Sequence, residues 1–371
     1  MATKQKTKLD SVRPNLKKLW RLKKYKAALD MLLQEMQAGT SRRLYVWISE
    51  TYLYMKDYFK AEEFALKAKS FPYEDYYTDK EIARHLGDVY YKMGWMYFLD
   101  KKHQQAIEIS KKAVEIDESV IGGYLLLGQI YYDMEEYEES IKHYNKGIKI
   151  CPPLVAKMVL KKKELSKVDY LSHPAVIKKL KSKILFSDLY LHKSYSVIEL
   201  NTPEEARALA LEALKFLPEK DDPSEINEFL AFCNVDIDYY YYNKGRSCIK
   251  KEKYKEAKEI LDKGLKSVNY PIGCHVMLSD MYDCLNDHEK SLDHANKARD
   301  NAALRSMVGI GVEKEDLSHM YALVSACRGN ALKELKRYEE AKEAFHEALK
   351  HAPPDEDMGY VHEELEELKW R

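Results

Sequence analysis

Residues 87–154 constrain the fold more than any other part of this chain, because they contain one pattern of residue types twice. Two consecutive blocks of 34 residues, 87–120 and 121–154, agree in register across their boundary. The aligned columns hold Tyr90/Tyr124, Met93/Leu127, Gly94/Gly128, Tyr97/Tyr131, Ala106/Ser140, Ser110/Tyr144 and Ala113/Gly147. Self-similarity at a fixed period of about 20–50 residues is typical of repeat architectures. The sequence therefore predicts a stack of similar units.

Each column has a physical reason. Gly128 and Ser140 are small, which indicates that the two helices of one repeat cross there, while the rings of Tyr131 and Tyr144 fill the space around the crossing. Pro152 is expected to end the second helix, because proline lacks an N–H group and clashes with the preceding turn. A single hairpin of this kind cannot bury its apolar face alone, so neighbouring hairpins must stack.

These columns resemble those of the tetratricopeptide-repeat (TPR) family, whose unit is a helical hairpin of about 34 residues. With residues 87–120 and 121–154 as repeats three and four, further copies cover residues 12–39 (repeat one, degenerate), 42–74 (two), 187–220 (five, weaker than the rest), 238–271 (six), 272–305 (seven) and 322–355 (eight). The resemblance implies an all-α fold, a right-handed α-α superhelix (TPR solenoid) of about eight helical hairpins. Residues 75–86, 221–237 and 306–321 predict inserted or lengthened helices, and 358–371 predict a C-terminal capping helix.

The copies predict three regions along the chain. Residues 1–154 form an N-terminal array of four repeats, and residues 187–371 form a C-terminal array of four repeats with the capping helix. Residues 155–186 between them are rich in lysine and lose the repeat columns, and Ser172-His173-Pro174 interrupts their helical spacing. We expect this stretch to be an irregular helical joint.

Composition fits a helical protein with wet outer faces: 45% of the residues are hydrophobic, 33% are charged, and only 11 are proline. The six cysteines include no C-x-x-C pair, which predicts reduced thiols and no metal site. No apolar run approaches the ~20 residues of a membrane span, and none follows the basic N-terminus as in a signal peptide. We therefore expect a cytoplasmic protein without a transmembrane segment.

Catalytic motifs are absent from the sequence. It contains no P-loop, no dinucleotide-binding glycine run and no H-E-x-x-H. Gly309-Ile310-Gly311 lacks the preceding strand and the third glycine that a nucleotide site requires, and is interpreted as a loop. The sequence thus predicts a protein that is not an enzyme and needs no cofactor.

The TPR resemblance implies a binding site in the concave groove, which in this family is lined by positions 2, 5, 9, 12 and 13 of each first helix. In repeats two to four these positions include five aromatic residues, which predict an aromatic wall with few charges. The implied partner-binding residues are Tyr54, Tyr91, Trp95, Phe98, Gln129 and Tyr132. The alternative is that the inserted helices of the chain itself cover these residues, and the sequence leaves both open.

One subfamily is disfavoured. Cochaperones that hold the C-terminal Glu-Glu-Val-Asp of heat-shock chaperones use a carboxylate clamp of lysine, asparagine and arginine on three first helices. The positions tested here hold Val46, Glu50, Lys92, Gly122 and Leu126. The expected function is therefore a scaffold or adaptor that holds another protein or a peptide segment, as part of a complex and without this clamp.

Two alternatives come from other features. A polyanion, either RNA or an acidic membrane surface, could bind the lysine-rich segment through Lys161, Lys162, Lys163, Lys178, Lys179 and Lys181. Against this, the formal net charge is zero, and lysine-rich helical faces are usually only solvated. The chain also resembles the peptide-pheromone receptors of Gram-positive bacteria, which would make it a peptide-sensing regulator, although no helix-turn-helix is evident at its N-terminus.

Overall fold

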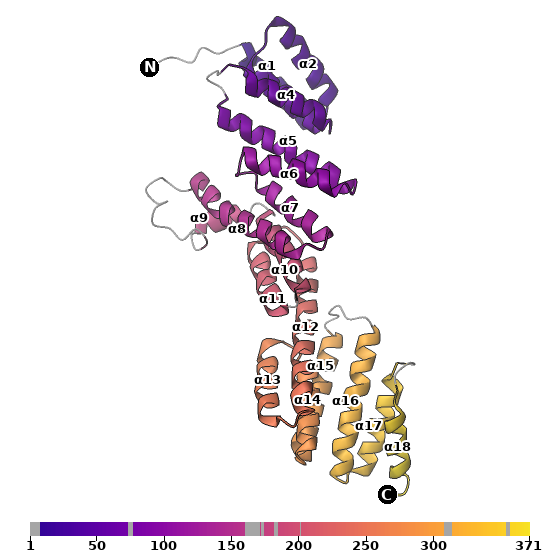
Figure 1. The fold of residues 1–371 in the computed structure, drawn as a ribbon. Helices are drawn as coiled ribbons and strands as arrows, with labels where there is room; N and C mark the ends of the chain where they lie inside the picture. Colours follow the sequence, from indigo (N-terminus) through magenta and orange to yellow (C-terminus); the bar gives the residue numbers. More distant parts are fainter. Residues whose placement is uncertain are drawn as a thin grey trace. The chain divides into compact units, whose positions relative to one another are not determined.

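The computed structural model describes residues 8–72, 77–159, 171, 174–181, 185–200, 202–307, 314–353 and 357–371. These residues form 18 helices and contain no β-sheet. Figure 1 shows the helices following one another as hairpins along the chain. The predicted all-α fold built from helical hairpins is confirmed.

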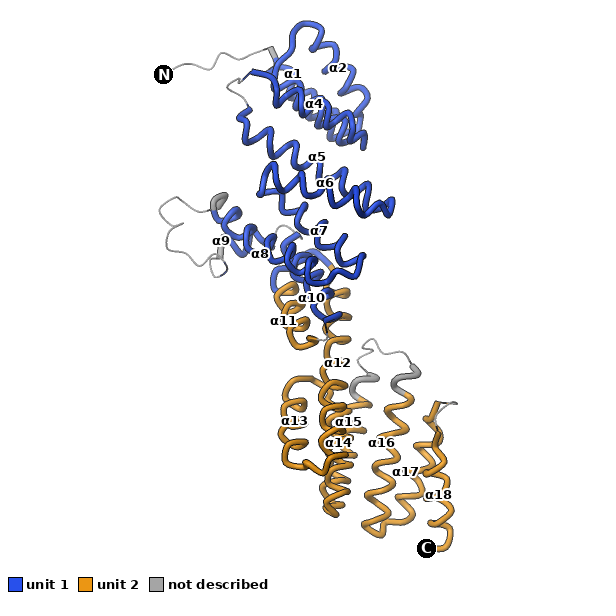
Figure 2. Tube along the Cα trace, in the orientation of Figure 1, with its two compact units in different colours: residues 1–200, 215–221 blue, residues 201–214, 222–371 orange. Residues whose placement is uncertain are grey.

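Two compact units divide the chain, and each is described by itself (Figure 2). Unit 1 comprises residues 1–200 and 215–221, and unit 2 comprises residues 201–214 and 222–371. The helices up to residue 200 are α1 Lys8–Arg21, α2 Tyr25–Ala38, α3 Arg42–Tyr54, α4 Tyr58–Ser70, α5 Asp79–Leu99, α6 His103–Ile116, α7 Ile121–Asp133, α8 Tyr137–Val159, α9 Pro174–Lys181 and α10 Leu185–Glu199.

The later helices are α11 Pro203–Phe216, α12 Ser224–Ile249, α13 Tyr254–Ser267, α14 Ile272–Cys284, α15 His288–Met307, α16 Lys314–Glu334, α17 Tyr338–His351 and α18 Gly359–Leu368. Consecutive helices pack as pairs within each unit: α3 with α4, α5 with α6, and α7 with α8 in unit 1, and α12 with α13, α14 with α15, and α16 with α17 in unit 2. First helices also contact the next first helix, as α5 does α7 and α12 does α14.

Small residues stand at the helix crossings, as their columns predict. Ala61, Ala106, Ala257 and Ala341 are all 0% exposed. A Cβ atom on Gly128 would collide with the ring of Tyr144, which comes from the second helix of the same hairpin. The pattern of small and aromatic residues therefore sets how closely the two helices of a repeat approach.

The turn inside a hairpin also recurs. Seven residues other than glycine, one in each of seven hairpin turns, have φ between 55° and 62°: Lys23, Lys56, Lys101, Glu135, Glu252, Asn286 and Lys336. At one of them the Lys101 N–H donates to the Phe98 carbonyl and the Lys102 N–H donates to the Tyr97 carbonyl, both at 2.9 Å. This is the pattern of a Schellman motif, which satisfies carbonyls at the end of a helix.

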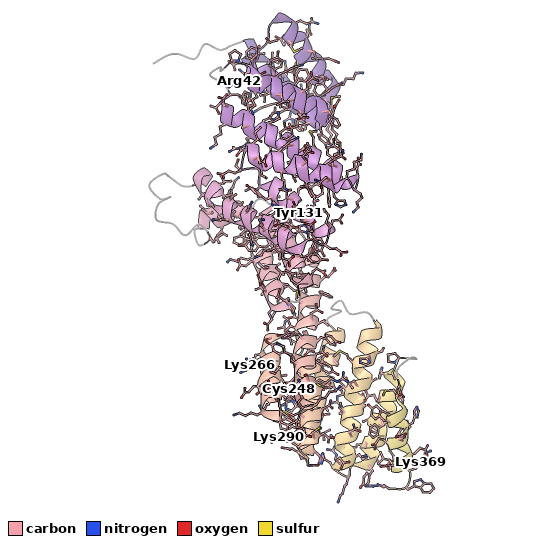
Figure 3. The ribbon with its side chains drawn as sticks, in the orientation of Figure 1. Arg42, Tyr131, Cys248, Lys266, Lys290 and Lys369 are labelled. Carbon is pink, nitrogen blue, oxygen red and sulfur yellow. The ribbon has the colours of Figure 1, made fainter. Side chains whose placement is uncertain are left out.

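The three inserts lengthen first helices, as expected. α5 and α16 have 21 residues each and α12 has 26. Arg42, labelled in Figure 3, holds the segment that leads into α5. Its guanidinium donates to the carbonyls of Phe71 at 2.9 Å and Tyr77 at 3.1 Å and pairs with Asp79 at 2.8 Å.

Two expectations are wrong. α8 does not end at Pro152 but continues through Pro152 and Pro153 to Val159. Proline costs a helix one hydrogen bond, but its fixed φ is helical, and the residues around it bury their side chains, with Val155 at 3% and Ala156 at 0% exposure. In the capping helix α18, the sequence predicts that Tyr360, Val361, Leu365 and Leu368 face inward. Val361 and Leu368 are buried, whereas Tyr360 is 44% exposed and does not face inward.

Candidate functional site

Trp95 and Phe98, on α5, form the aromatic centre of the predicted groove. Their ring centroids lie 5.5 Å apart at 68°, an edge-to-face arrangement. Both side chains are half-buried and pack against the cluster that contains Leu126 and Ile130 of α7. The structure thus brings these two predicted residues together and leaves part of each ring accessible.

Tyr91 lies one turn earlier on α5 and is also half-buried. Its ring covers Gly122, where an added Cβ would come within 2.8 Å of the ring. Burial raises the pKa of Tyr91, and a side-chain hydrogen bond with Trp95 opposes that rise. Tyr91 therefore belongs to the same set of contacts as Trp95, and its position depends on the absence of a side chain at Gly122.

A cavity of about 330 Å³ opens beside Tyr91. Its lining includes Arg84, Asp88 and Gly122 from the first helices or the residues near them, and Leu154, Leu180 and Phe186 from α8, α9 and α10. The Nε atom of Arg84 lies 3.4 Å from the Oδ2 atom of Asp117. The hollow is apolar at its α8–α10 side and charged at its α5 side.

Gln129 and Tyr132, on α7, contact α10. The Gln129 amide nitrogen lies 3.0 Å from Nε2 of His192. Burial is the largest cause that raises the pKa of Tyr132. The neighbouring carboxylate of Glu199, at the end of α10, is the second. These two predicted residues are thus engaged by the next repeat, and His192 joins the same face although the sequence analysis did not single it out. The weak columns of repeat five were the only signal for it.

Tyr54 lies among different neighbours. It is 50% exposed, and its ring stacks on Tyr25 of α2 at 5.4 Å and 9° and contacts Trp20 of α1 at 5.4 Å. The Trp20 indole donates to the Thr51 hydroxyl at 3.0 Å. The structure therefore places Tyr54 in an aromatic cluster with the preceding hairpin, and the sequence analysis missed Trp20 and Tyr25 because repeat one is degenerate.

The lysines of the polyanion hypothesis fall in two groups. Lys161, Lys162 and Lys163 lie outside the described residues. Lys178, Lys179 and Lys181 lie on α9, where Lys178 is exposed and the other two are half-buried. Val176 and Leu180 of the same helix are 0% and 1% exposed. α9 is thus amphipathic, with a buried apolar side and lysines around the rest.

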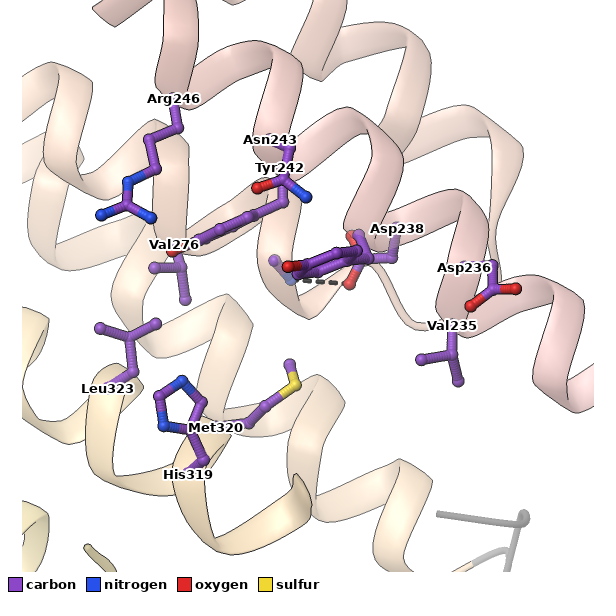
Figure 4. A pocket seen from close by; sticks show the side chains of 12 residues that line it. Val235, Asp236, Asp238, Tyr242, Asn243, Arg246, Val276, His319, Met320 and Leu323 are labelled. Carbon is purple, nitrogen blue, oxygen red and sulfur yellow. Dashed lines mark hydrogen bonds between the residues drawn. The ribbon is translucent and has the colours of Figure 1, made fainter. Parts of the chain in front are cut away.

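Unit 2 contains a second hollow, of about 400 Å³, which the sequence analysis did not name (Figure 4). It is lined by residues of three consecutive first helices: Tyr239, Tyr242, Asn243 and Arg246 of α12, Gly273 and Val276 of α14, and His319, Met320 and Leu323 of α16. The groove positions used for repeats two to four, applied to residues 238–355, identify several of these residues. The signal was therefore present in the sequence.

The buried Asp238 and the half-buried Asp236 line this hollow, and the half-buried Asp280 lies on α14 outside its lining. Asp238 accepts hydrogen bonds from the backbone N–H groups of Gly273 at 2.7 Å and Cys274 at 3.0 Å, and so caps the start of α14. Asp280 accepts from the Cys327 thiol at 3.3 Å, and burial raises the pKa of Asp280 to about 6. In the part of the chain that the structure describes, no group of three or more His, Cys, Asp or Glu side chains could hold a metal ion.

No helix within the described ranges is long and apolar enough to cross a membrane. A family model described as anaphase-promoting complex, cyclosome, subunit 3 matches residues 62–147. Two models described as tetratricopeptide repeat match residues 239–267 and 322–355. This chain is a tetratricopeptide-repeat protein. Stacked repeats present extended binding surfaces, so this chain has the architecture of a protein-interaction scaffold.

Among curated proteins, this chain is similar to human (Homo sapiens) DnaJ homolog subfamily C member 7, with 31% identity over 109 residues. The match covers 29% of this chain and 20% of that protein, so it spans about a fifth of the relative's length.

Solved structures similar to this chain include the APC/C hetero-tetramer Cut9-Hcn1, with a TM-score of 0.42 and 12% identity. The match covers 98% of this chain and 90% of the chain in that structure. The P58(IPK) TPR domain has a TM-score of 0.32, 13% identity and 98% coverage of both chains.

Proposed function

We propose that this chain is a non-catalytic scaffold that holds a segment of a partner protein on the first-helix face of α5 and α7 in unit 1. The observation that carries the proposal is the edge-to-face pair of Trp95 and Phe98, half-buried beside Tyr91 and its cavity. Large rigid rings supply contact area at little cost in conformational entropy, and tryptophan and tyrosine are enriched among the residues that dominate binding energy. The partner segment therefore presents apolar side chains to these rings.

The residues at the carboxylate-clamp positions support a partner that is not held by its terminal carboxylate. Val46 and Leu126 are 2% and 0% exposed, so neither position reaches the groove. Gly122 lies under the ring of Tyr91. Glu50 stands at a position where the clamp needs lysine or asparagine, and burial raises the pKa of its carboxyl group to about 7. We therefore propose recognition through apolar and aromatic contacts.

The match to a subunit of the anaphase-promoting complex is consistent with a partner within a larger assembly. It covers α4 to α8, the part of unit 1 that includes Trp95 and Phe98. We therefore propose that the partner segment lies on this part of unit 1.

The test compares Trp95→Ala with Phe59→Ala in the full chain. Phe59 is 57% exposed on α4, a second helix, and serves as a control for loss of an exposed ring. Truncation of a central anchor typically costs about 2 kcal/mol or more of binding. We expect Trp95→Ala to weaken a partner captured from native extract at least tenfold, while Phe59→Ala does not, and both variants to keep the wild-type melting temperature.

Two results would contradict the proposal. A sharp fall in melting temperature for Trp95→Ala would show that the ring is part of the core. Unchanged binding with an intact fold would move the partner to another face, and retention on heparin that Lys178→Glu abolishes would then favour the polyanion hypothesis.

A further inference from the structure

The turn between α1 and α2 gathers cations with no acidic residue among them. Between Asp10 and Asp30 the chain has seven lysine or arginine residues and no aspartate or glutamate. Two of the seven, Arg13 and Lys17, act on the carboxyl group of Glu50 and oppose the rise of its pKa on burial. The other five are exposed and form no ion pair with any described residue: Lys18, Arg21, Lys23, Lys24 and Lys26. The chain therefore leaves the positive charge of this turn unneutralised.

Three other hairpins show that this is not a requirement of the turn. In each of them the second helix also begins after a cation, and that cation pairs with a nearby carboxylate. The pairs are Lys102 with Asp100 at 3.2 Å, Lys253 with Glu256 at 3.1 Å, and Arg337 with Glu340 at 2.6 Å. α2 begins after Lys24 and has neither an acidic residue in its first turn nor a side-chain cap. Since a helix N-terminus favours negative charge, helix stability does not account for the lysines placed here.

An apolar side chain lies at the apex of the same turn. Leu22 is 52% exposed. The backbone around it is fixed, because the Lys23 N–H donates to the Trp20 carbonyl at 3.0 Å and the Lys24 N–H donates to the Leu19 carbonyl at 2.9 Å. The turn therefore presents an aliphatic side chain to solvent between exposed cations.

The α3–α4 turn repeats this arrangement. Met55 is 40% exposed, and the exposed Lys56 that follows it forms no ion pair with any described residue. The rings of Tyr25 and Tyr54 stack with centroids 5.4 Å apart at 9°, and so connect the two turns. The exposed aliphatic side chains and the cations thus belong to one continuous part of unit 1.

We propose that these two turns form a surface that docks on an acidic phospholipid bilayer. The aliphatic side chains enter the interface, and the cations lie against the phosphates and carboxylates of the headgroups. Binding of this kind grows with the apolar area that is buried and with the electrostatic attraction to anionic lipids. The surface comprises Leu22, Met55, Lys18, Arg21, Lys23, Lys24, Lys26 and Lys56.

The aromatic residues beside these cations favour lipid over nucleic acid. Single-stranded nucleic acids bind where bases can stack on accessible rings. Here Trp20 and Tyr25 are half-buried and both contact Tyr54, and the Trp20 indole already donates to the Thr51 hydroxyl. The most exposed apolar side chain at the α1–α2 turn is instead the aliphatic Leu22, which suits a hydrocarbon interface.

This surface does not rest on the function proposed for unit 1, because it uses neither Trp95 nor Phe98. It also differs from the lysine-rich segment of the polyanion hypothesis, because it uses none of the lysines of α9. The variants Trp95→Ala and Lys178→Glu therefore separate the three sites on the same full-length chain.

The experiment measures co-flotation of the full chain with vesicles of phosphatidylcholine that contain about a third of phosphatidylserine, at about 0.15 M salt. We expect binding to these vesicles and none to pure phosphatidylcholine. The double variant Lys23→Gln, Lys24→Gln should weaken partition about 25-fold, because each cation close to an acidic bilayer contributes about fivefold. Leu22→Ser should weaken it at least about threefold, because the exposed part of the leucine no longer leaves water.

Matched controls come from the α5–α6 turn. Lys101 and Lys102 hold the same two turn positions as Lys23 and Lys24, with φ of 58° at Lys101 and 55° at Lys23, but each pairs with a carboxylate. Leu99 is 73% exposed in that turn. The double variant Lys101→Gln, Lys102→Gln and the variant Leu99→Ser should therefore bind as the wild type does, as should Trp95→Ala.

Four results would overturn the proposal. The chain fails to float with the acidic vesicles, Leu22→Ser binds as the wild type does, or the Lys101, Lys102 variant loses as much as the Lys23, Lys24 variant. In the fourth, an equal phosphate concentration of polyuridylate displaces the chain completely, which would assign the turns to nucleic acid. A loss that only Lys178→Glu produces would likewise assign the binding to α9. Circular dichroism melting checks that each variant keeps the fold.

Discussion

The first helices of unit 1 and unit 2 are built on the same columns but present different chemistry at their exposed positions. In unit 1 the face around Trp95 and Phe98 is aromatic, with two rings in edge-to-face contact. In unit 2 the face of α12 presents tyrosine, asparagine and arginine side chains to a hollow. The columns that fix the fold lie at the helix crossings, so the remaining positions vary without altering the architecture. The scaffold therefore does not determine the ligand.

The two units also share a buried acid at one repeat position. Glu50 of α3 and Asp280 of α14 both occupy position 9 of their first helices. Burial raises the pKa of Glu50 to about 7 against the nearby Arg13 and Lys17. It raises the pKa of Asp280 to about 6, although a hydrogen bond from the Cys327 thiol opposes the rise. Each unit thus keeps a carboxyl group where its charged form is disfavoured.

The largest effect that tests this comparison is overpacking at a helix crossing. Gly128 of unit 1 and Gly329 of unit 2 face the buried rings of Tyr144 and Phe345. We expect Gly128→Val and Gly329→Val each to cost about 3 kcal/mol of stability, the upper part of the usual range, and Ala106→Leu or Ala257→Leu to cost about 1–3 kcal/mol.

Hydrogen exchange gives the readout for these variants. Because a repeat couples mainly to its neighbours, protection should fall in the unit that carries the substitution. Equal loosening of both units by either glycine variant would show that they unfold as one body and would break the comparison.

A smaller effect comes from the buried acids. Folded Glu50 keeps its proton up to about pH 7, whereas the unfolded chain releases it near its ordinary pKa of 4.5. Between these values the folded state binds more protons, so stability falls as the pH rises through this window. Glu50→Gln should therefore raise the free energy of unfolding at pH 8 by about 1–3 kcal/mol and change it little at pH 4.

Asp280→Asn is the matched variant in unit 2. The same sign applies there, over a window from the ordinary pKa of 3.8 to about 6. Chemical denaturation at several pH values measures both. If the variants gain the same free energy of unfolding at pH 4 and at pH 8, packing and not ionisation distinguishes them from the wild type.

The smallest effect concerns the hairpin turns. Lys56 of unit 1 and Asn286 of unit 2 have φ of 62° and 57°. The left-handed region costs most residues about 1–2 kcal/mol, and asparagine tolerates it better. Lys56→Gly should stabilise unit 1 by about 0.5–1 kcal/mol after the entropy of glycine in the unfolded chain is subtracted, and Asn286→Gly should be nearly neutral. Melting temperatures compare the two, and a larger gain at Asn286 would contradict this ranking.

The sequence predicted the hairpins because small and aromatic residues, such as Gly128 and Tyr144, recur at the helix crossings, and their sizes alone indicate where two helices meet. It also predicted the lengthened α5, α12 and α16, because the inserts keep helical spacing. It did not predict that α8 passes through Pro152, since that outcome depends on burial of Val155 and Ala156 by distant residues. It did not single out the hollow beside Arg246, because the groove positions were considered only in repeats two to four, although the same positions in residues 238–355 include several of its lining residues.

Stacking of neighbours has a consequence for how the protein is made. Gln129 and His192, which are 63 residues apart in the sequence, lie within hydrogen-bond distance of each other on α7 and α10. Contacts so close along the chain carry a low entropic cost of loop closure and favour rapid folding. Each hairpin can therefore close while the ribosome is still synthesising the next one. Assembly can therefore follow the order of synthesis, because the described helices pack mainly against helices that are near them in the sequence.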